Sequence, residues 1–332
     1  LNENKKYQYQ ILVCAGAGCV SSDCSAVRDA IIEQVNSLSL NKKVRVYETG
    51  CMGTCAVGPV MLILPDRIFY TNLTPDIAKK IVKTHIIDNK ILVGHTFSDH
   101  ALRKHIPKID DISFFNEQVR IALRNCGVLE YSSIEAYIAS GGYLSAAKAL
   151  TEMNDEMIIE EIKISGLCGR GGAGFPTGIK WDAGRKAESD IKYIVCNADE
   201  GDPGAFMDRS IIEGDPHTLI EGMIIAGYAI GATKGYVYIR AEYPLAVERL
   251  DTAIKQACEY GLLGNNIFGS GFDFTLEIRI GAGAFVCGEE TSLMSSIEGN
   301  RGEPRQKPPF PFEKGLFEKP TIINNAETIA SI

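Results

Sequence analysis

Four of the ten cysteines are close enough in the sequence to form one ligand set. They are Cys14 and Cys19, followed after 31 intervening residues by Cys51 and Cys55. Grouped cysteines favour metal or cluster ligation over disulfides in a reducing compartment, and four thiolates are the ligands of a [2Fe-2S] cluster. Structural zinc is the alternative, although zinc sites usually have tighter C-x2-C pairs. Cys24, a fifth cysteine nearby, is either an alternative ligand or a residue on a helix face.

The sequence GRGGAG at residues 169–174 contains four glycines in six positions. Glycine permits positive φ and lets bare N–H groups approach an anion, so this loop favours phosphate or pyrophosphate binding. A dinucleotide fingerprint requires a strand before the loop, whereas residues 154–166 have helical periodicity. A P-loop is excluded because Lys180 is followed by Trp181, where Ser or Thr is required. A glycine-rich surface loop without a ligand is the alternative.

Amide and acidic side chains follow one of the predicted strands. Asn197, Asp199 and Glu200 come directly after an apolar run that predicts a buried strand. At the carboxyl end of that strand they could accept hydrogen bonds from sugar hydroxyls or from a ring N–H. The alternative is a solvated acidic turn. Glu289 and Glu290 open a helix, where the helix dipole favours carboxylates with or without a ligand.

Two patterns of strands and helices position these residues. Residues 7–88 predict a strand, a helix, a strand, a hairpin and a closing helix, an order that suits a small thioredoxin-like layer of helices on a sheet. Residues 191–280 alternate strands with helices, which predicts a parallel sheet in an α/β layer. In such sheets ligands bind at the carboxyl ends of the strands. Residues 114–166 predict helices.

The composition narrows the class of protein. A chain of 332 residues is long enough for two or three domains, and its net charge of −8 argues against a nucleic-acid partner. No apolar stretch reaches the 18 or so residues that a membrane span needs, and the N-terminal residues lack the core of a signal peptide. We therefore expect a cytoplasmic protein that does not insert directly into a membrane.

Four stretches carry a resemblance to a known family. They are GRGGAGFPTGIKW at 169–181, CNADEGDPGAFMDR at 196–209, GAGAFVCGEETSL at 281–293, and the run from 307 to 325 with KPPF and the start of INNAET. Together they resemble the NADH/FMN-binding flavoprotein subunit of the complex I 51 kDa type. Most similar is the beta subunit of soluble NAD(P)-linked, bifurcating iron-only hydrogenases. The N-terminal module resembles the thioredoxin-like [2Fe-2S] domain that is fused to such subunits.

The resemblance implies a domain order. We expect an N-terminal thioredoxin-like [2Fe-2S] ferredoxin domain at residues 1–90 and a linker at 91–113. Residues 114–332 would then form a helical segment plus a Rossmann-like α/β FMN-binding domain. The family's β-rich domain and its helical bundle with a [4Fe-4S] cluster are absent from this sequence, so that cluster is expected in a missing C-terminal part.

The resemblance also implies the contacts of the cofactors. For FMN it implies Gly169, Arg170, Gly172, Lys180, Asn197, Asp199, Glu200, Phe285, Gly288, Glu289, Asn324 and Asn325. For the nicotinamide nucleotide it implies Phe175, Asp202, Glu290, Lys307 and Phe310, and for the metal Cys14, Cys19, Cys51 and Cys55. No side chain is implied as an acid, base or nucleophile, because FMN carries the chemistry, and Glu200 has a supporting role.

The implied function is an electron-input module of a multisubunit oxidoreductase, of the NADH dehydrogenase or diaphorase type. Hydride would pass between NAD(H) and FMN, and single electrons would then pass to iron–sulfur clusters. The fused N-terminal module favours a soluble hydrogenase-type assembly. The implied partners are a 24 kDa-type [2Fe-2S] subunit and a large iron–sulfur or catalytic subunit. Alternatives are a flavin-free docking subunit, or the same module in a formate dehydrogenase or in complex I.

Charge predicts which nicotinamide nucleotide is preferred. NADP carries a 2′-phosphate that NAD lacks, and the two residues expected near that ribose, Asp202 and Glu290, are acidic. Repulsion between like charges therefore favours NAD. Lys307 offsets part of this repulsion if it reaches the phosphate.

Overall fold

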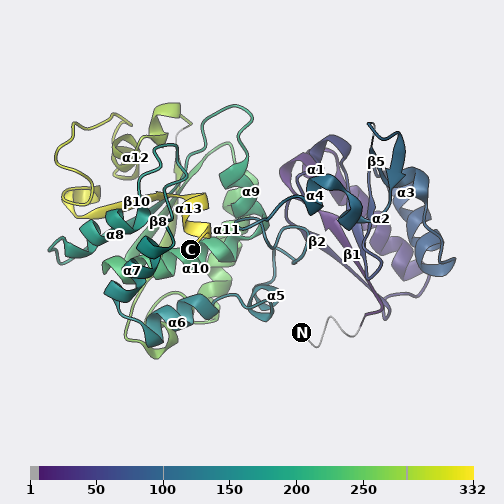
Figure 1. Ribbon diagram of the computed structural model, residues 1–332, viewed down its shortest axis with the longest axis horizontal. Coiled ribbons are helices and arrows are strands. Elements are labelled where there is room, and N and C mark those ends of the chain that lie inside the picture. Colours follow the sequence, from purple (N-terminus) through teal and green to yellow (C-terminus); the bar gives the residue numbers. More distant parts are fainter. Residues whose placement is uncertain (1–6, 100, 282) are drawn as a thin grey trace. The chain divides into compact units, whose positions relative to one another are not determined.

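The computed structural model describes residues 7–99, 101–281 and 283–332, and the chain divides into two compact units at residues 1–136 and 137–332. Each unit has a four-stranded sheet of its own (Figure 1). The division lies further along the chain than the boundaries expected at residues 90 and 113. The packing of residues 91–136 explains this difference.

The first unit contains a sheet with the strand order β2-β1-β3-β4. β1 pairs in parallel with β2 and antiparallel with β3, which pairs antiparallel with β4. Helices α2 and α3 pack against each other, and the predicted order of strands and helices in this module is confirmed. The elements are β1 (Tyr9–Cys14), α1 (Ala17–Ser21), α2 (Cys24–Ser37), β2 (Val44–Thr49), β3 (Met61–Leu64), β4 (Ile68–Tyr70), α3 (Pro75–Ile81), β5 (Phe97–Asp99), β6 (Lys104–Ile106) and α4 (Ser113–Asn116). Helix α5 (Ile134–Ala139) includes the boundary between the two units.

Residues 91–136 pack onto the first sheet, where the sequence predicted a linker and then helices. β5 and β6 form an antiparallel hairpin, and Ile109 and Ile112 behind it are buried in the core of the unit. Further along, Glu130 forms a bridge with Thr49 of β2 and an ion pair of 2.7 Å with Arg45. The buried isoleucines supply the apolar area that holds this segment against the sheet.

The second unit is an α/β layer around a parallel sheet with the order β10-β7-β8-β9. The predicted alternation of strands and helices is confirmed, and β10 is an additional strand on the outer side of β7. The elements are α6 (Leu144–Glu152), α7 (Asp155–Ile164), α8 (Thr177–Lys186), β7 (Tyr193–Ala198), α9 (Met207–Gly214), α10 (Pro216–Ile230), β8 (Lys234–Arg240), α11 (Pro244–Glu259), β9 (Thr275–Gly281), α12 (Glu290–Ile297), β10 (Thr321–Asn325) and α13 (Ala326–Ala330).

Helix α10 is the centre of the second unit. All of its residues except Tyr228 are buried, which is the pattern of a helix enclosed by other elements. It contacts β7 and β8 as well as α8 and α13. A Cβ atom at Gly222 would lie 2.3 Å from the backbone oxygen of Ile329, so only glycine permits this approach of α10 to α13. The close packing fixes α13 beside the sheet.

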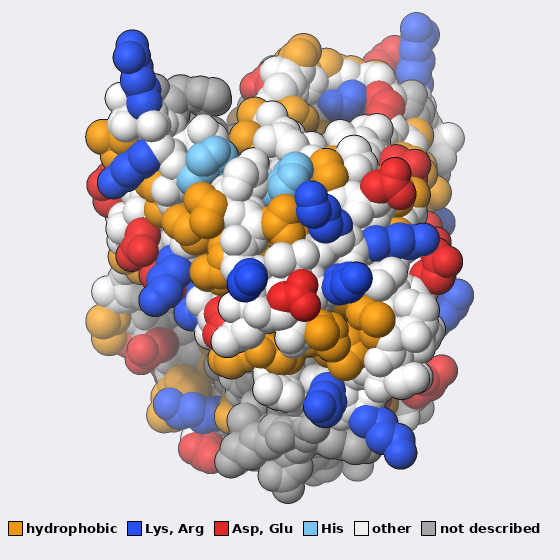
Figure 2. All heavy atoms as spheres, turned by 90° about the vertical axis from the view of Figure 1, so that its right-hand side faces the viewer, with side chains coloured by type: hydrophobic (Ala, Val, Ile, Leu, Met, Phe, Trp, Pro, Cys, Tyr) orange, Lys and Arg blue, Asp and Glu red, His pale blue; other side chains and the backbone are white. Residues whose placement is uncertain are grey.

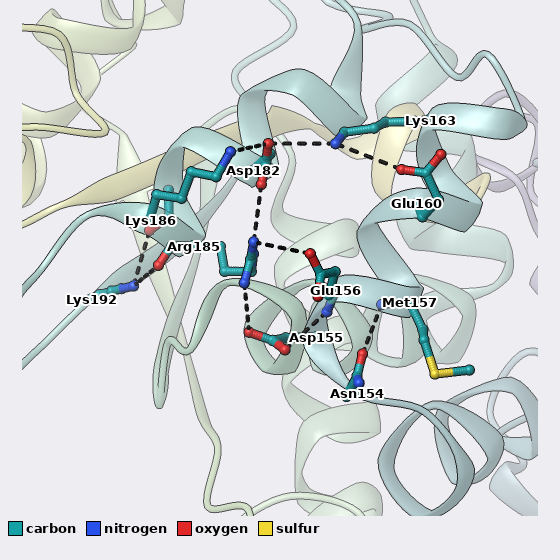
Figure 3. Close-up of polar contacts among 11 residues, drawn as sticks. Asn154, Asp155, Glu156, Met157, Glu160, Lys163, Asp182, Arg185, Lys186 and Lys192 are labelled. Atoms are coloured by element: carbon teal, nitrogen blue, oxygen red, sulfur yellow. Dashed lines mark hydrogen bonds and ion pairs between the residues drawn. The ribbon is translucent and has the colours of Figure 1, made fainter.

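Helix α8 is attached to α7 by polar contacts and by one close crossing (Figure 3). Asp182 of α8 accepts a hydrogen bond from Lys163 of α7 at 3.4 Å, and within α8 it accepts one from Lys186 at 2.8 Å. At the crossing, a Cβ atom at Gly178 would lie 2.9 Å from the backbone nitrogen of Lys163. Exposed ion pairs contribute roughly 1 kcal/mol or less, so close packing has the larger part in fixing α8.

Charged side chains of both signs and hydrophobic side chains share one face of the molecule. Figure 2 shows one face of the molecule, on which Lys and Arg side chains are interspersed with Asp and Glu, and hydrophobic side chains lie between them. Neither sign of charge dominates this face. Within residues 7–99, 101–281 and 283–332, the helices are too short or too polar to cross a membrane.

Candidate functional site

A cavity of about 640 Å³ opens at the carboxyl ends of β7 and β10. Because these strands are parallel and Asn325 is paired with Asn197, both side chains are brought to the same edge of the sheet. This volume is in the range of small-molecule and cofactor pockets, roughly 300–1,000 Å³. The predicted contact residues that line it are Gly169, Phe175, Lys180, Asn197, Gly288, Glu289, Glu290, Lys307, Phe310, Asn324 and Asn325, and Gly174 of the glycine-rich loop lines it as well.

The glycine-rich loop forms one wall of this cavity. A bridge between Cys168 and Pro176 closes the loop, and the Gly169 N–H donates to the Phe175 oxygen at 2.8 Å. Gly172 and Gly174 have φ of +104° and +63°, a region that residues with a Cβ rarely adopt. No atom of another residue lies within 4 Å of a Cβ built at either glycine. The loop thus presents open backbone of the kind that an anion can approach.

Helix α8 supplies a lysine and a tryptophan that hold the end of β10. The Trp181 ring is fully buried, and its Nε1–H donates to Oδ1 of Asn324 at 2.9 Å. The Nζ of Lys180 donates to the backbone oxygen of Ile323 at 2.7 Å. Burial lowers the pKa of Lys180, and the neighbouring Glu290 carboxylate offsets part of this lowering. Lys180 therefore faces the cavity from a fixed position.

Four charged side chains form a cluster in the cavity wall. Lys307 bonds Glu290 at 2.5 Å and Glu289 at 3.2 Å, and Lys180 lies 3.6 Å from Glu290. Although burial alone would lower it, these carboxylates raise the pKa of Lys307. Glu289 also caps α12 by accepting from the N–H groups of Thr291 and of the next residue. The two lysines balance the two glutamates, so the cluster is neutral as a whole.

Asp199 has an unsatisfied oxygen beside the cavity. Asn197 donates to the Gly288 oxygen at 2.9 Å and accepts from the Asp199 N–H at 3.0 Å, which fixes the turn after β7. Oδ2 of Asp199 is buried without a hydrogen-bond partner among the described residues, and it would lie 3.5 Å from a Cβ at Gly288. Burial raises the pKa of Asp199 to about 6. A buried polar atom without a partner is costly, and a ligand hydroxyl or N–H would satisfy it.

Five further predicted residues lie outside the cavity wall, besides Asp199. Glu200 caps α9 by accepting from the Met207 N–H at 2.7 Å. Phe285 is 73% exposed, and its ring covers Gly201, at 2.5 Å from a Cβ built there. The remaining three are Arg170, whose N–H donates to Thr328, together with Gly172 and the exposed Asp202.

Several lining residues were not predicted. Ile179 and Ala183 line the cavity from α8, beside Lys180 and one turn beyond it. Helical spacing from Lys180 would have indicated Ala183 as a residue of the same face. Pro311 and Phe312 line it from the segment after Lys307. That segment is irregular, so no periodicity could have indicated them.

The four grouped cysteines of the first unit come together at the ends of β1 and β2. The Cys14 thiol lies within hydrogen-bonding reach of Cys19 and of Cys51, and Cys51 is also in reach of Cys55. The Cys19 thiol contributes most to raising the pKa of Cys14 to about 12, and burial adds to it. Cys24 is buried at the start of α2 in the hydrophobic core. Cys24 therefore lies on a helix face, which was one of the two alternatives that the sequence left open.

The thiols of these four cysteines form one continuous chain of contacts. The contacts run from Cys19 through Cys14 and Cys51 to Cys55. Among the described side chains, no group of three or more His, Cys, Asp or Glu is set to hold a single metal ion. Small residues permit the approach, because a Cβ at Gly18 would lie 2.9 Å from the Cys55 sulfur. Such a group of thiols ionises readily only when a cation compensates the charge.

Comparisons with known proteins match both units. Residues 1–85 match the family described as thioredoxin-like [2Fe-2S] ferredoxin, and residues 162–332 match the family described as Nuo51 FMN-binding domain. Subunit HndC of the NADP-reducing hydrogenase of Solidesulfovibrio fructosivorans is 63% identical over 216 residues, which cover 65% of this chain and 44% of that protein.

Other similar proteins extend over nearly the whole chain. The alpha subunit of the NAD-reducing hydrogenase HoxS of Cupriavidus necator is 37% identical over 98% of this chain and 52% of that protein. A crystal structure of an NAD⁺-reducing [NiFe]-hydrogenase in the H₂-reduced state has a TM-score of 0.54 at 26% identity, with the same coverages. This chain thus spans about half the length of these relatives. The match at residues 162–332 covers more than half of this chain, so the chain belongs to the Nuo51 FMN-binding domain family.

Proposed function

We propose that this chain is the electron-input part of a multisubunit oxidoreductase of the NADH dehydrogenase type. FMN, when bound in the cavity, supplies the chemistry that accepts a hydride from a nicotinamide nucleotide and releases electrons singly to iron–sulfur clusters. The observation that carries this proposal is the cavity at the carboxyl ends of β7 and β10. A glycine loop and a lysine line it, and an unsatisfied carboxylate oxygen of Asp199 lies close behind Gly288 of its wall.

The residues around the cavity fit the groups of a flavin mononucleotide. The open backbone at Gly172 and Gly174 suits the phosphate, and Lys180 adds a positive charge to the same wall. Asp199 offers an acceptor to a hydroxyl or a ring N–H. Further contacts would come from Gly169, Asn197, Gly288, Asn324 and Asn325. Arg170, Glu200 and Phe285 are further candidates, which lie outside the cavity wall as Gly172 and Asp199 do.

A nicotinamide nucleotide would enter from the open side of the cavity. Phe175 and Phe310 line the cavity, and both rings are about half exposed, at 51% and 46%. Exposed aromatic rings at a pocket can stack on the flat rings of a dinucleotide. Lys307 and Glu290 would contact its sugars and phosphates. In this arrangement the protein binds and orients the reactants, and no side chain is required as a catalytic acid or base.

The relatives favour a hydrogenase-type assembly. The alignment with the HoxS alpha subunit covers 98% of this chain and so includes both units, whereas the NADH-quinone oxidoreductase F subunits align over about 60%. We infer that the partners are iron–sulfur subunits, including a 24 kDa-type [2Fe-2S] subunit and a large catalytic subunit. A [4Fe-4S] cluster that receives the electrons, electron bifurcation and a cytoplasmic location are parts of the same proposal.

Flavin absorbance tests the proposal directly. Purified protein incubated with FMN is expected to retain it after gel filtration, and NADH is expected to bleach the flavin absorption near 450 nm without oxygen. The matched control is the same protein treated identically without FMN, in which NADH should change nothing at this wavelength. A chain that retains no FMN would instead support the flavin-free docking subunit.

The charge cluster changes the expected choice between NAD and NADP. Asp202 lies outside the cavity wall, and Glu290 is paired with two lysines, so the repulsion of a 2′-phosphate is weaker than the sequence predicted. The relatives point both ways, since HndC is named for NADP and HoxS for NAD. We still propose NAD as the preferred nucleotide, by a smaller margin.

Glu290→Gln is expected to shift this preference towards NADPH. The change leaves Lys180, Lys307 and Glu289, with a net charge of +1. A pair of unit charges about 10 Å apart interacts by about 1.7 kcal/mol at an effective dielectric near 20, which corresponds to roughly twentyfold. The ratio of kcat/KM for NADPH to that for NADH should rise by this factor. Glu303→Gln, at an exposed glutamate outside the cavity wall, is the control, and an equal ratio in both variants would contradict the placement of Glu290.

A further inference from the structure

A buried carboxylate lies directly behind the wall of the cavity. Asp208 is the second residue of α9 and only 3% exposed. Both of its oxygens accept from the same nitrogen, Nδ2 of Asn325, at 2.9 and 2.8 Å. Since Asn325 lines the cavity, one amide group separates the Asp208 carboxylate from whatever the cavity binds.

The orientation of that amide is fixed from its other end. Oδ1 of Asn325 accepts from the Glu327 N–H at 2.9 Å. An N–H can only pair with the oxygen of the amide, so the NH₂ end must face Asp208. A carboxylate accepts such a bond in its ionised form with either oxygen, and in its protonated form still with one. Asp208 therefore keeps Asn325 in place whether or not it carries a proton.

The charged groups around Asp208 are mainly acidic. The Glu200 carboxylate caps the same helix end and accepts from the Asp208 N–H at 3.4 Å, and Glu327 lies on α13. The buried Cys196 thiol of β7 is also close enough to interact. On α9 itself, Arg209 and Glu213 are paired with each other at 2.8 Å. Burial first, and then the charge of Glu200, raise the pKa of Asp208 to about 7.

We propose that Asp208 is a positioning residue that holds Asn325 against the flavin and takes up a proton when negative charge accumulates in the cavity. This inference rests on the proposed function, with FMN in the cavity. The electrons arrive as the hydride of the nicotinamide nucleotide, and the proton comes from water and binds to one Asp208 oxygen. The other oxygen keeps its bond from Asn325. No other bond to Asp208 forms or breaks.

The test is the pH dependence of the flavin midpoint potential in the full chain loaded with FMN. In the parent protein we expect reduction to take up one additional proton per two electrons above about pH 7, and none below it, where Asp208 is already protonated. In Asp208→Asn this additional uptake should vanish. A second change of slope near pH 6, from Asp199, should remain in both proteins. Asp182→Asn, at a carboxylate whose pKa is lowered by Lys186, should reproduce the parent profile.

A second measurement covers the case in which Asp208→Asn does not load FMN. The infrared difference spectrum of the parent at pH 8, reduced minus oxidised, should gain a carboxylic acid C=O band. In Asp208→Glu, which keeps the carboxyl group, the band and the change of slope near pH 7 should both move. A parent without the band, or Asp208 variants with the parent's profile, would overturn the inference while leaving the proposed function intact. A parent that retains no FMN would overturn both.

Discussion

Replacing Cys51 by alanine is expected to abolish the [2Fe-2S] signal in the EPR spectrum of the reduced protein. Its thiol lies between those of Cys14 and Cys55, so its loss leaves one iron with a single protein ligand. The cluster content should fall from near one per chain to near zero. The FMN content should stay unchanged, because the flavin residues belong to the other compact unit.

Cys24→Ala is the matched control for this experiment. Cys24 is a neighbouring cysteine that is buried in the hydrophobic core at the start of α2, whereas Cys51 is only partly buried. We expect this variant to keep its cluster and its EPR signal. If the EPR signal survived in Cys51→Ala but disappeared in Cys24→Ala, Cys24 would be the cluster ligand in place of Cys51. Stoichiometric zinc in the parent, without iron, would contradict the cluster itself.

Replacing Gly174 by valine is expected to reduce the affinity for FMN more than a hundredfold. Gly174 lines the cavity with φ of +63°, a conformation that costs a residue with a Cβ roughly 1–2 kcal/mol. The branched side chain would also occupy open space where the backbone must approach the phosphate. The strain lowers stability, and the blocked approach to the phosphate is expected to weaken FMN binding by more than the roughly 2.7 kcal/mol that corresponds to a hundredfold. Fluorescence titration with FMN measures the change.

Gly166→Val separates backbone strain from blocked binding. Gly166 has φ of +66° and also has no neighbour within 4 Å of a built Cβ, but it follows α7 outside the cavity wall. It should lose similar stability and bind FMN nearly as well as the parent. If Gly174→Val and Gly166→Val bound FMN with equal affinity, the glycine-rich loop would be an ordinary surface loop without a ligand. The same pair can be compared by thermal unfolding to show that the strain is matched.

The regular elements of the second unit were predictable because their patterns are strong. Within the stretch predicted to alternate strands with helices, KGYVYIR occupies residues 234–240 as β8, and the apolar run before it forms α10, Pro216–Ile230. Continuous apolar runs with turn residues between them give such elements clear bounds. The carboxyl ends of these strands then indicate where a ligand binds, and Asn197 lies in the cavity wall as expected from that rule.

The parts that the sequence could not indicate depend on distant residues. β10 has only five residues, TIINN, which is too short for a periodicity, and its partner β7 is far away in the chain. The bond between Asp208 and Asn325 spans 117 positions. Asp202 and Phe285 were assigned by resemblance; Asp202 lies in an irregular segment, and Phe285 begins a single short 3₁₀ turn, Phe285–Gly288. Local pattern carries no information on these contacts.

The pairing of β10 with β7 has a consequence for how the protein is made. Asn325 and its partner Asn197 are 128 positions apart, so at ribosomal speeds of about 5–20 residues per second β7 waits on the order of ten seconds for its neighbour. During this interval one edge of β7 has unpaired backbone groups, a template on which other nascent chains can add a strand. The last polar residues of the cavity, Asn324 and Asn325, arrive on that same strand. Free FMN therefore cannot assist the earlier stages of folding, and a ribosome that stalls before Thr321 releases a chain with an open sheet and no means of retaining its flavin.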